Sequence, residues 1–378
     1  SIIEEGVLID NFKLVEKGQI REKAFRELLA SGPYPARNID QNLADMRAQI
    51  AANEKGVQEL HRMVRTFGLD VVQAYMQHVQ NNAEESVRRV IDALQDGEFS
   101  YEMDCGAQIR VTVSVNSEER SAVVDFTGTS AQLDSNFNTP KAVCMAAVLY
   151  VFRTLVNDEI PMNQGCLKPI KVIIPEACML NPKYPAATVA GNVETSQAIT
   201  DTLYGALRVM ASSQGTMNNF TFGNDTYQYY ETIAGGAGAG MILREDGSTE
   251  LFPGTDVVQT HMTNSRLTDP EIFEWRYPVL LEEFSIRLNS GGKGAVNGGN
   301  GGTRRIRFLE PMTASMLANH RRVAPFGMAG GEDGEVGSNY VEKTDGSRVE
   351  LGATGSVEMQ AGDVFVIHTP GGGGFGEK

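Results

Sequence analysis

The chain is poor in cysteine and histidine, with four cysteines and five histidines among 378 residues. The cysteines form no Cys-x-x-Cys pair and are too few for a disulfide scaffold, so we expect reduced thiols in a cytosolic protein. The histidines form no His-x-His or His-Glu-x-x-His motif. A zinc or non-haem iron site made only from residues of this chain is therefore not expected.

Basic residues are outnumbered by acidic ones, and the formal net charge is −15. A nucleic-acid or anionic-membrane surface would need a basic stripe, so neither partner is expected. No apolar run approaches the roughly 20 residues that span a bilayer. The opening sequence SIIEE has neither the basic start nor the apolar segment of a secretory signal. Together these absences favour a cytoplasmic location.

The chain also lacks nucleotide-binding and serine-hydrolase motifs. Residues 291–302 hold seven glycines, but they lack the Gly-Lys-Ser/Thr ending of a P-loop and the spacing of a dinucleotide-binding turn. No Gly-x-Ser-x-Gly elbow occurs. We therefore expect that this chain does not bind ATP by itself.

Glycine is distributed unevenly, and its distribution divides the chain. Only six of the 40 glycines fall in the first hundred residues, where apolar residues recur with a helical period. This pattern predicts helices over residues 42–50, 57–67 and about 70–94. We predict an α+β fold with a helical N-terminal region (1–97), a central mixed α/β region (98–283) and a β-rich C-terminal region (284–378).

In the central region, residues 109–115 alternate and lead through a turn into residues 121–126, which predicts a β-hairpin. The apolar segment 141–155 predicts a buried helix, and residues 196–211 suit another helix. Near the end, HTPGGGGFG follows the strand-like run 364–367. Four successive glycines are entropically unfavourable to order, so we expect a backbone segment that approaches another group closely.

Several loops combine glycine with amide or carboxylate side chains. Asparagine and glutamine form hydrogen bonds without charge, so such loops suit the orientation of a polar, amide-like small molecule. Ordinary turn chemistry is the alternative. We expect eight of these side chains to gather around one cleft, with backbone amides of the glycine turns facing it. The candidates are His261, Glu194 and Glu231 for catalysis, and Asn192, Asn218, Asn219, Asn264 and Arg266 for substrate binding.

At these loops the sequence resembles the hydantoinase B family, and within it the C-terminal half of the 5-oxoprolinases. The matching segments follow one another across nearly the whole chain, and their combination is specific. They are NLADMRAQIAAN (42–53), DFTGTSAQLDSNFNTP (125–140), NQGCL (163–167), GNVETSQ (191–197), SQGTMNN (213–219), YETIAGGAGAG (230–240), HMTNSRLTDPE (261–271) and HTPGGGGFG (368–376).

The resemblance implies the B-type component of an ATP-dependent cyclic-amide hydrolase, a 5-oxoprolinase or hydantoinase. A hydantoinase A-type partner would bind ATP and phosphorylate the amide oxygen, and the B-type component would open the activated ring. For a cyclic amide with a carboxylate, Arg266 would bind the carboxylate and the amides would bind the ring. The alternatives are a subunit of an acetone- or acetophenone-type carboxylase, and a non-catalytic fragment or scaffold of such a complex.

This sequence differs from the family that it resembles in one large respect. Members of that family carry roughly 150 further residues before the position of Ser1, including histidine- and aspartate-rich motifs that would supply ligands for a divalent metal. A missing N-terminal segment or a second chain would have to supply them. We therefore expect no metal ligands in this chain and no activity from the isolated chain.

Overall fold

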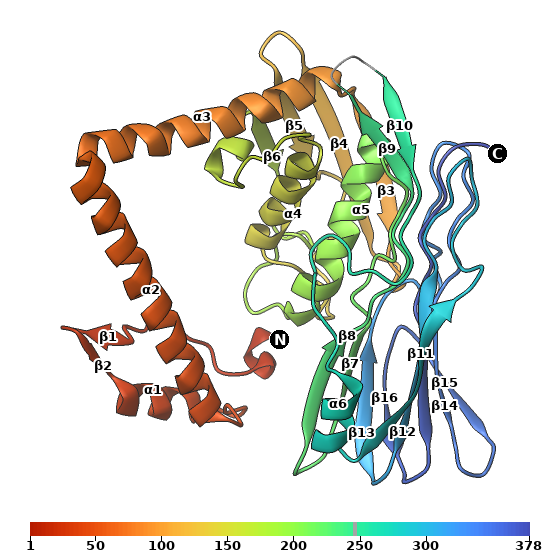
Figure 1. Ribbon diagram of the computed structural model, residues 1–378. Helices are drawn as coiled ribbons and strands as arrows, with labels where there is room; N and C mark the ends of the chain where they lie inside the picture. Colours follow the sequence, from red (N-terminus) through yellow and green to blue (C-terminus); the bar gives the residue numbers. More distant parts are fainter. Residues whose placement is uncertain (245–247) are drawn as a thin grey trace.

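A computed structural model describes residues 1–244 and 248–378 and confirms the predicted α+β fold. A helical arm leads into an α/β layer, and a β-rich part follows beside it (Figure 1). The hairpin of β9 (Gly240–Leu243) and β10 (Thr249–Phe252) stands beside the α/β layer. The site described below lies where the α/β layer meets the β-rich part.

The N-terminal region forms a helical arm that stands away from the rest of the molecule (Figure 1). The two helices predicted over 42–50 and 57–67 are one continuous helix, because the residues between them include no proline and Gly56 alone does not end a helix. Gly68, at φ 87°, separates this helix from the next. The elements are η1 (Ile2–Glu5), β1 (Val15–Glu16), β2 (Gln19–Ile20), α1 (Glu22–Leu29), α2 (Ile39–Phe67) and α3 (Leu69–Ala93).

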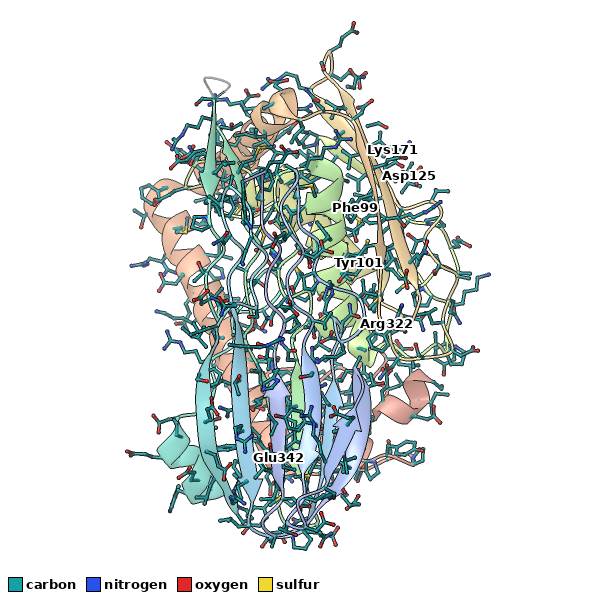
Figure 2. The ribbon with its side chains drawn as sticks, turned by 90° about the vertical axis from the view of Figure 1, so that its right-hand side faces the viewer. Phe99, Tyr101, Asp125, Lys171, Arg322 and Glu342 are labelled. Atoms are coloured by element: carbon teal, nitrogen blue, oxygen red, sulfur yellow. The ribbon has the colours of Figure 1, made fainter. Side chains whose placement is uncertain are left out.

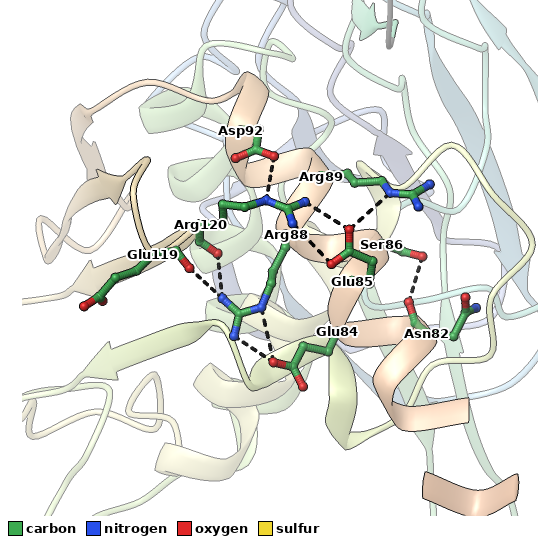
Figure 3. Close-up of polar contacts among 9 residues, drawn as sticks. All are labelled: Asn82, Glu84, Glu85, Ser86, Arg88, Arg89, Asp92, Glu119 and Arg120. Carbon is green, nitrogen blue, oxygen red and sulfur yellow. Dashed lines mark hydrogen bonds and ion pairs between the residues drawn. The ribbon is translucent and has the colours of Figure 1, made fainter. Parts of the chain in front are cut away.

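The second half of α3 is attached to the body by a network of charged side chains (Figure 3). Arg120 donates to Asp92 at 2.8 Å and to Glu85 at 3.2 Å. Arg88 binds Glu84 at 2.7 Å and also donates to two backbone carbonyls in the turn after β4. These contacts fix the base of the arm against the sheet that follows.

A four-stranded sheet and two helices form the α/β layer. The strand order is β3-β4-β5-β6, with antiparallel pairs except for the parallel pair β5–β6. The predicted hairpin is therefore present as β4 and β5. Helices α4 and α5 pack with this sheet in the largest hydrophobic core. The elements are β3 (Gly97–Glu102), β4 (Gln108–Asn116), β5 (Ser121–Asp125), α4 (Lys141–Thr154), η2 (Gln164–Leu167), β6 (Ile170–Ile173), η3 (Gly191–Thr195) and α5 (Ser196–Leu207).

The β-rich part contains two antiparallel sheets that share a second core. Their strand orders are β16-β13-β7-β8 and β11-β12-β17-β14-β15. Because β7 and β8 pair with β13, the sheets join the central and C-terminal regions. The elements are β7 (Asn219–Gly223), β8 (Gln228–Thr232), α6 (Pro270–Arg276), β11 (Val279–Arg287), β12 (Gly301–Phe308), β13 (Met312–Leu317), β14 (Ser338–Glu342), β15 (Arg348–Leu351), β16 (Thr354–Met359) and β17 (Val364–His368).

Glycine-rich segments without strand structure pack directly against one another between these parts. Successive amides of residues 371–374 donate to different segments, at the carbonyls of Glu335, Gly299, Ser212 and Glu332. A Cβ atom on Gly372 would lie 2.0 Å from the carbonyl oxygen of Ala237. Only glycine fits such a packing of backbones, as at the axis of collagen. The expected close approach of the C-terminal glycines is confirmed, and the group they approach is other backbone.

Candidate functional site

Helix α5 forms the centre of a buried polar layer between the two halves of the molecule. All twelve of its residues are buried. It continues from a π-helical turn, Gly191–Thr195, a feature that often marks functional sites. Glu194, Gln197 and Asp201 are spaced i, i+3 and i+7, so they follow one face of the helix. Burying this polar stripe requires partners from the surrounding loops.

The Glu194 carboxyl is completely buried. Its Oε1 accepts hydrogen bonds from the backbone amide of Met217 at 3.0 Å and from Nδ2 of Asn219 at 2.7 Å. Its Oε2 has no well-aligned hydrogen-bond partner among the described residues, although the Thr216 hydroxyl is close. Burial raises the pKa of Glu194 from 4.5 to about 8. The carboxyl therefore holds a proton at neutral pH.

Arg321 lies in the same layer and binds the loop that precedes β7. Its Nη2 donates to Oδ1 of Asn218 at 2.8 Å, and the Asn218 amide donates in turn to Gln214 at 2.8 Å and to the carbonyl of Ile233 at 2.9 Å. Burial lowers the pKa of Arg321 to about 10, while the charges of Glu194 and Asp104 oppose this shift. The guanidinium stays charged at neutral pH and is the cation of the layer.

Asp201 and His261 form a second pair farther along α5. Nε2 of His261 lies 3.3 Å from Oδ1 of Asp201, at ion-pair distance but outside hydrogen-bond alignment. Ser212 donates to the other Asp201 oxygen at 3.2 Å. The His261 backbone has φ 57°, which is uncommon for a residue other than glycine and typical of strained functional positions. The Tyr204 ring packs on the imidazole with centroids 5.2 Å apart.

Tyr101 of β3, labelled in Figure 2, and His320 complete the layer. The Tyr101 hydroxyl contacts Nε2 of His320, whose Nδ1 donates to the carbonyl of Val323 at 2.6 Å. Burial raises the pKa of Tyr101, and the charges of Asp201 and Glu194 add to the rise. Burial likewise lowers the pKa of His320, so its imidazole is neutral at physiological pH. These two groups form a neutral hydrogen-bonded pair beside the charged residues.

Several polar atoms of this layer have no hydrogen-bond partner among the described residues. Four of them are Oε1 of Gln197, Oγ1 of Thr260, Nε2 of Gln214 and Nε of Arg321. An unpaired buried polar group usually costs about 1–3 kcal/mol, so a cluster of them is typical of functional sites rather than of a structural core. The layer holds both donors and acceptors, as a proton-transfer site requires.

A family model described as Hydantoinase B/oxoprolinase matches residues 1–378. The chain belongs to the hydantoinase B/oxoprolinase family. It is 43% identical over 390 residues to 5-oxoprolinase from Dictyostelium discoideum and 44% identical over 403 residues to 5-oxoprolinase 1 from Arabidopsis thaliana. Both alignments cover 100% of this chain, but they cover 30% and 31% of these relatives. The chain thus spans about a third of their length.

A solved structure supports the fold of this oxoprolinase-family chain. The ATP-dependent caprolactamase from Pseudomonas jessenii superposes with a TM-score of 0.81 at 22% identity, covering 99% of this chain and 67% of the caprolactamase chain. Within the described ranges, no helix is long and apolar enough to cross a membrane. Nor do three or more histidine, cysteine, aspartate or glutamate side chains in these ranges gather as a metal site would require.

The structure brings together only some of the residues proposed for the oxoprolinase-family site. Glu194 contacts Asn219 directly, and Arg321 contacts Asn218. His261 joins the same layer through Asp201. The remaining candidates lie elsewhere: Asn192, Asn264 and Arg266 are exposed, and Glu231 forms a separate buried ion pair with Arg304.

Glu231 lies outside the layer because successive side chains of a β strand point to opposite faces of the sheet. It pairs with Phe220, whereas Asn219 pairs with Thr232, so Glu231 and Asn219 point to opposite faces of the sheet. Several backbone amides of the glycine turns bond within the protein. The amide of Gly191 donates to the carbonyl of Thr188, that of Gly236 to the carbonyl of Pro370, and that of Gly238 to the Ser213 hydroxyl.

Sequence reasoning did not select several members of the layer. Gln197 and Asp201 could have been found, because with Glu194 they are spaced i, i+3 and i+7 along one face of the helix. Arg321 and His320 carry no local signal, since they come from a loop about a hundred residues after Asn218. Tyr101 occupies an inward position of β3 like an ordinary core residue.

The raised pKa of Glu194 predicts a pH-dependent stability. The folded carboxyl keeps its proton up to about pH 8, whereas the unfolded one loses it near 4.5. The free energy of unfolding should therefore fall as pH rises between these values, by up to about 1.4 kcal/mol per pH unit from this group. Urea unfolding at several pH values should show a flatter profile for Glu194→Gln. The exposed Glu118→Gln is the control and should keep the wild-type slope.

Proposed function

We propose that this chain is the B-type part of an ATP-dependent 5-oxoprolinase, which opens a cyclic amide after a partner component has phosphorylated the amide oxygen. The observation that carries this proposal is the match of the whole chain to 5-oxoprolinases. An unstrained lactam is stabilised by resonance, and O-phosphorylation turns its oxygen into a good leaving group. Water would add at that carbon, and cleavage of the C–N bond with protonation of the nitrogen would leave an acyl phosphate. A second water would hydrolyse this acyl phosphate to the open amino acid and phosphate.

The exposed substrate-binding candidates are carried by two segments that the buried layer holds together. Nε2 of Gln197 donates to the carbonyl of Thr260 at 3.1 Å, which joins the start of α5 to the loop after Thr260. Asn192 lies on the first segment, and Asn264 and Arg266 lie on the second. We propose that these three side chains bind the ring and its carboxylate at the surface where the partner component docks.

The buried residues would act beneath this surface. The protonated Glu194 carboxyl can donate, and the Asp201–His261 pair can accept or return a proton, as ring opening requires at the nitrogen. Asn218 and Asn219 hold Glu194 and Arg321 in place and are proposed as positioning residues. We propose that Glu231 does not contact the substrate and contributes only by holding Arg304 and strand β8 in place.

ATP and a metal ion would be bound outside this chain. No nucleotide motif occurs in the sequence, and the described residues do not fit a metal site. We propose that a hydantoinase A-type component binds ATP, and that a segment matching the remaining two thirds of the 5-oxoprolinases supplies any divalent-metal ligands.

The proposal is tested by assaying the complete enzyme, with partner component and N-terminal segment, for glutamate formation from 5-oxoproline. We expect turnover that requires ATP. Phosphate release without ring opening, or ring opening without ATP, would contradict the proposed division of labour. A panel of hydantoins and larger lactams assayed in parallel defines which ring is preferred.

Arg266→Ala tests the surface assignment in the same assay. Removing a charge-assisted hydrogen bond to the substrate carboxylate should raise KM about 10- to 150-fold. The exposed Arg276→Ala, at the end of α6, is the matched control and should leave KM unchanged. The two variants should also differ with a lactam that lacks the carboxylate, for which Arg266→Ala should have little effect. An unchanged KM for 5-oxoproline would remove Arg266 from the site.

A further inference from the structure

Strand β8 carries a tyrosine that the buried layer described above does not include. Tyr230 lies one residue before Glu231 and pairs with Thr221. Because successive side chains of a strand alternate, Tyr230 points to the same face of the sheet as Asn219, and Glu231 points to the other. Tyr230 is 52% exposed, so its ring reaches the surface. It therefore lies between the buried layer and a surface to which a substrate has access.

A chain of hydrogen bonds joins Tyr230 to the buried Glu194. The Tyr230 hydroxyl donates to Oδ1 of Asn219 at 2.7 Å, and Nδ2 of Asn219 donates to Oε1 of Glu194 at 2.7 Å. The same Nδ2 also donates to the carbonyl of Leu317 at 2.8 Å. Burial raises the pKa of Tyr230, so its phenol keeps its hydrogen at neutral pH. These contacts hold the tyrosine hydroxyl in a fixed place beside the layer.

The surroundings of Asn219 fix the direction of this chain. The Leu317 carbonyl can only accept a hydrogen bond, so the NH2 group of Asn219 faces it and the amide oxygen faces Tyr230. The single phenol hydrogen of Tyr230 is therefore committed to Asn219. No residue in the described ranges donates to the Tyr230 oxygen. The hydroxyl thus offers a bound molecule an acceptor and not a donor.

The loop that carries the exposed substrate-binding candidates, residues 260–267, passes the same strand. β8 is the edge strand of its sheet. Just before the loop, Nε2 of Gln259 donates to the carbonyl of Thr232 at 3.2 Å. Just after it, Oγ1 of Thr268 lies within hydrogen-bond distance of the Tyr229 hydroxyl, at 3.1 Å. Both ends of the loop are therefore attached to β8, on either side of the exposed tyrosine along the strand.

We propose that Tyr230 recognises the ring N–H of the cyclic amide, with the tyrosine oxygen accepting that hydrogen. This role rests on the proposed function and adds one contact to the same site. The N–H is the only hydrogen-bond donor of a secondary lactam ring, so an acceptor fixed by Asn219 selects a ring that has it. In 5-oxoproline the N–H is next to the carbon that bears the carboxylate. An accepting Tyr230 and a donating Arg266 would therefore bind neighbouring groups of one ligand.

Tyr230→Phe tests this contact in the complete enzyme, with partner component and N-terminal segment. The probe is 3-oxocyclopentanecarboxylate, which has the shape of 5-oxoproline with CH2 in place of N–H and serves as a competitive inhibitor. The substitution should raise KM for 5-oxoproline about 2- to 12-fold, which corresponds to the loss of one neutral hydrogen bond. It should not raise the inhibition constant of the carbocycle, because that ring has no hydrogen to donate.

Tyr227→Phe is the matched control and should change neither constant. Tyr227 precedes the same strand and bonds to Asn224 through its backbone, whereas its hydroxyl has no hydrogen-bond partner among the described residues. If Tyr230→Phe raises both constants equally, Tyr230 has only a structural role, and the proposed contact is overturned. An unchanged KM for 5-oxoproline would overturn it as well. A wild-type enzyme that does not turn over 5-oxoproline would instead overturn the proposed function, and the contact with it.

Discussion

Replacing Gly372 with alanine is expected to prevent the chain from folding. The added Cβ would lie 2.0 Å from the carbonyl oxygen of Ala237 and 2.3 Å from its carbonyl carbon. Neither atom can move alone, because Gly299 donates to that same carbonyl and Gly372 donates to the carbonyl of Gly299. Overpacking a side chain costs about 1–3 kcal/mol, and a clash between hydrogen-bonded backbones should exceed that range.

The measurement is the yield of soluble chain and its urea unfolding curve. Gly352→Ala is the matched control, because the nearest atom to its Cβ is the carbonyl oxygen of Thr354 at 3.9 Å. It should stay within about 0.5 kcal/mol of wild type. A Gly372→Ala chain that unfolds like the control would show that the glycine segments can separate without loss of the fold.

Arg304→Met is expected to destabilise the β-rich part by about 3–5 kcal/mol, because it leaves the Glu231 carboxylate buried without its cation. The pair is bidentate, with Nε and Nη2 of Arg304 at 2.7 and 2.9 Å from the two carboxylate oxygens. Both side chains are almost completely inaccessible. The guanidinium also lies over the ring of Phe273, with 5.6 Å between the guanidinium carbon and the ring centroid.

Changing both partners separates the charge effect from packing. Arg304→Met combined with Glu231→Leu should recover much of the lost stability, since replacing a whole buried pair by apolar residues is often neutral. Arg89→Met, which removes an arginine from an exposed pair with Glu85 (Figure 3), should change the unfolding free energy by less than about 1 kcal/mol. A small effect of Arg304→Met alone would show that Glu231 takes up a proton instead.

The sequence patterns predicted most of the individual helices and strands. They were less successful in predicting where neighbouring segments form one continuous helix and where a helix ends. The period of apolar residues correctly indicated α3, α4 and the hairpin of β4 and β5, because burial on one face dictates that period. The same pattern divided α2 in two, since residues 51–56 carry no large apolar side chain to continue it. Helix α5 ends at Leu207 rather than Ala211, because Arg208 adopts a left-handed backbone.

The candidate site was predictable where its residues share a segment or a family motif. Glu194, Asn218 and Asn219 come from two such motifs and meet in space. Glu231 also lies in a motif, yet a shift of one residue along a strand turns a side chain to the other face. No sequence rule shows which residue next to a glycine-rich run points inward. Only the strand pairing of β7 and β8 shows that Glu231 and Asn219 lie on opposite faces of the sheet.

The position of β17 and of the glycines after it has a consequence for synthesis. β17 lies in the middle of its five-stranded sheet, and residues 371–376 then bond to segments that begin as early as Ser212. All of these segments leave the ribosome before their partner does. The β-rich part therefore cannot complete its folding until residue 376 has left the ribosome, because the central strand position of the five-stranded sheet stays unoccupied until then. A chaperone that shields this open sheet would act during that interval.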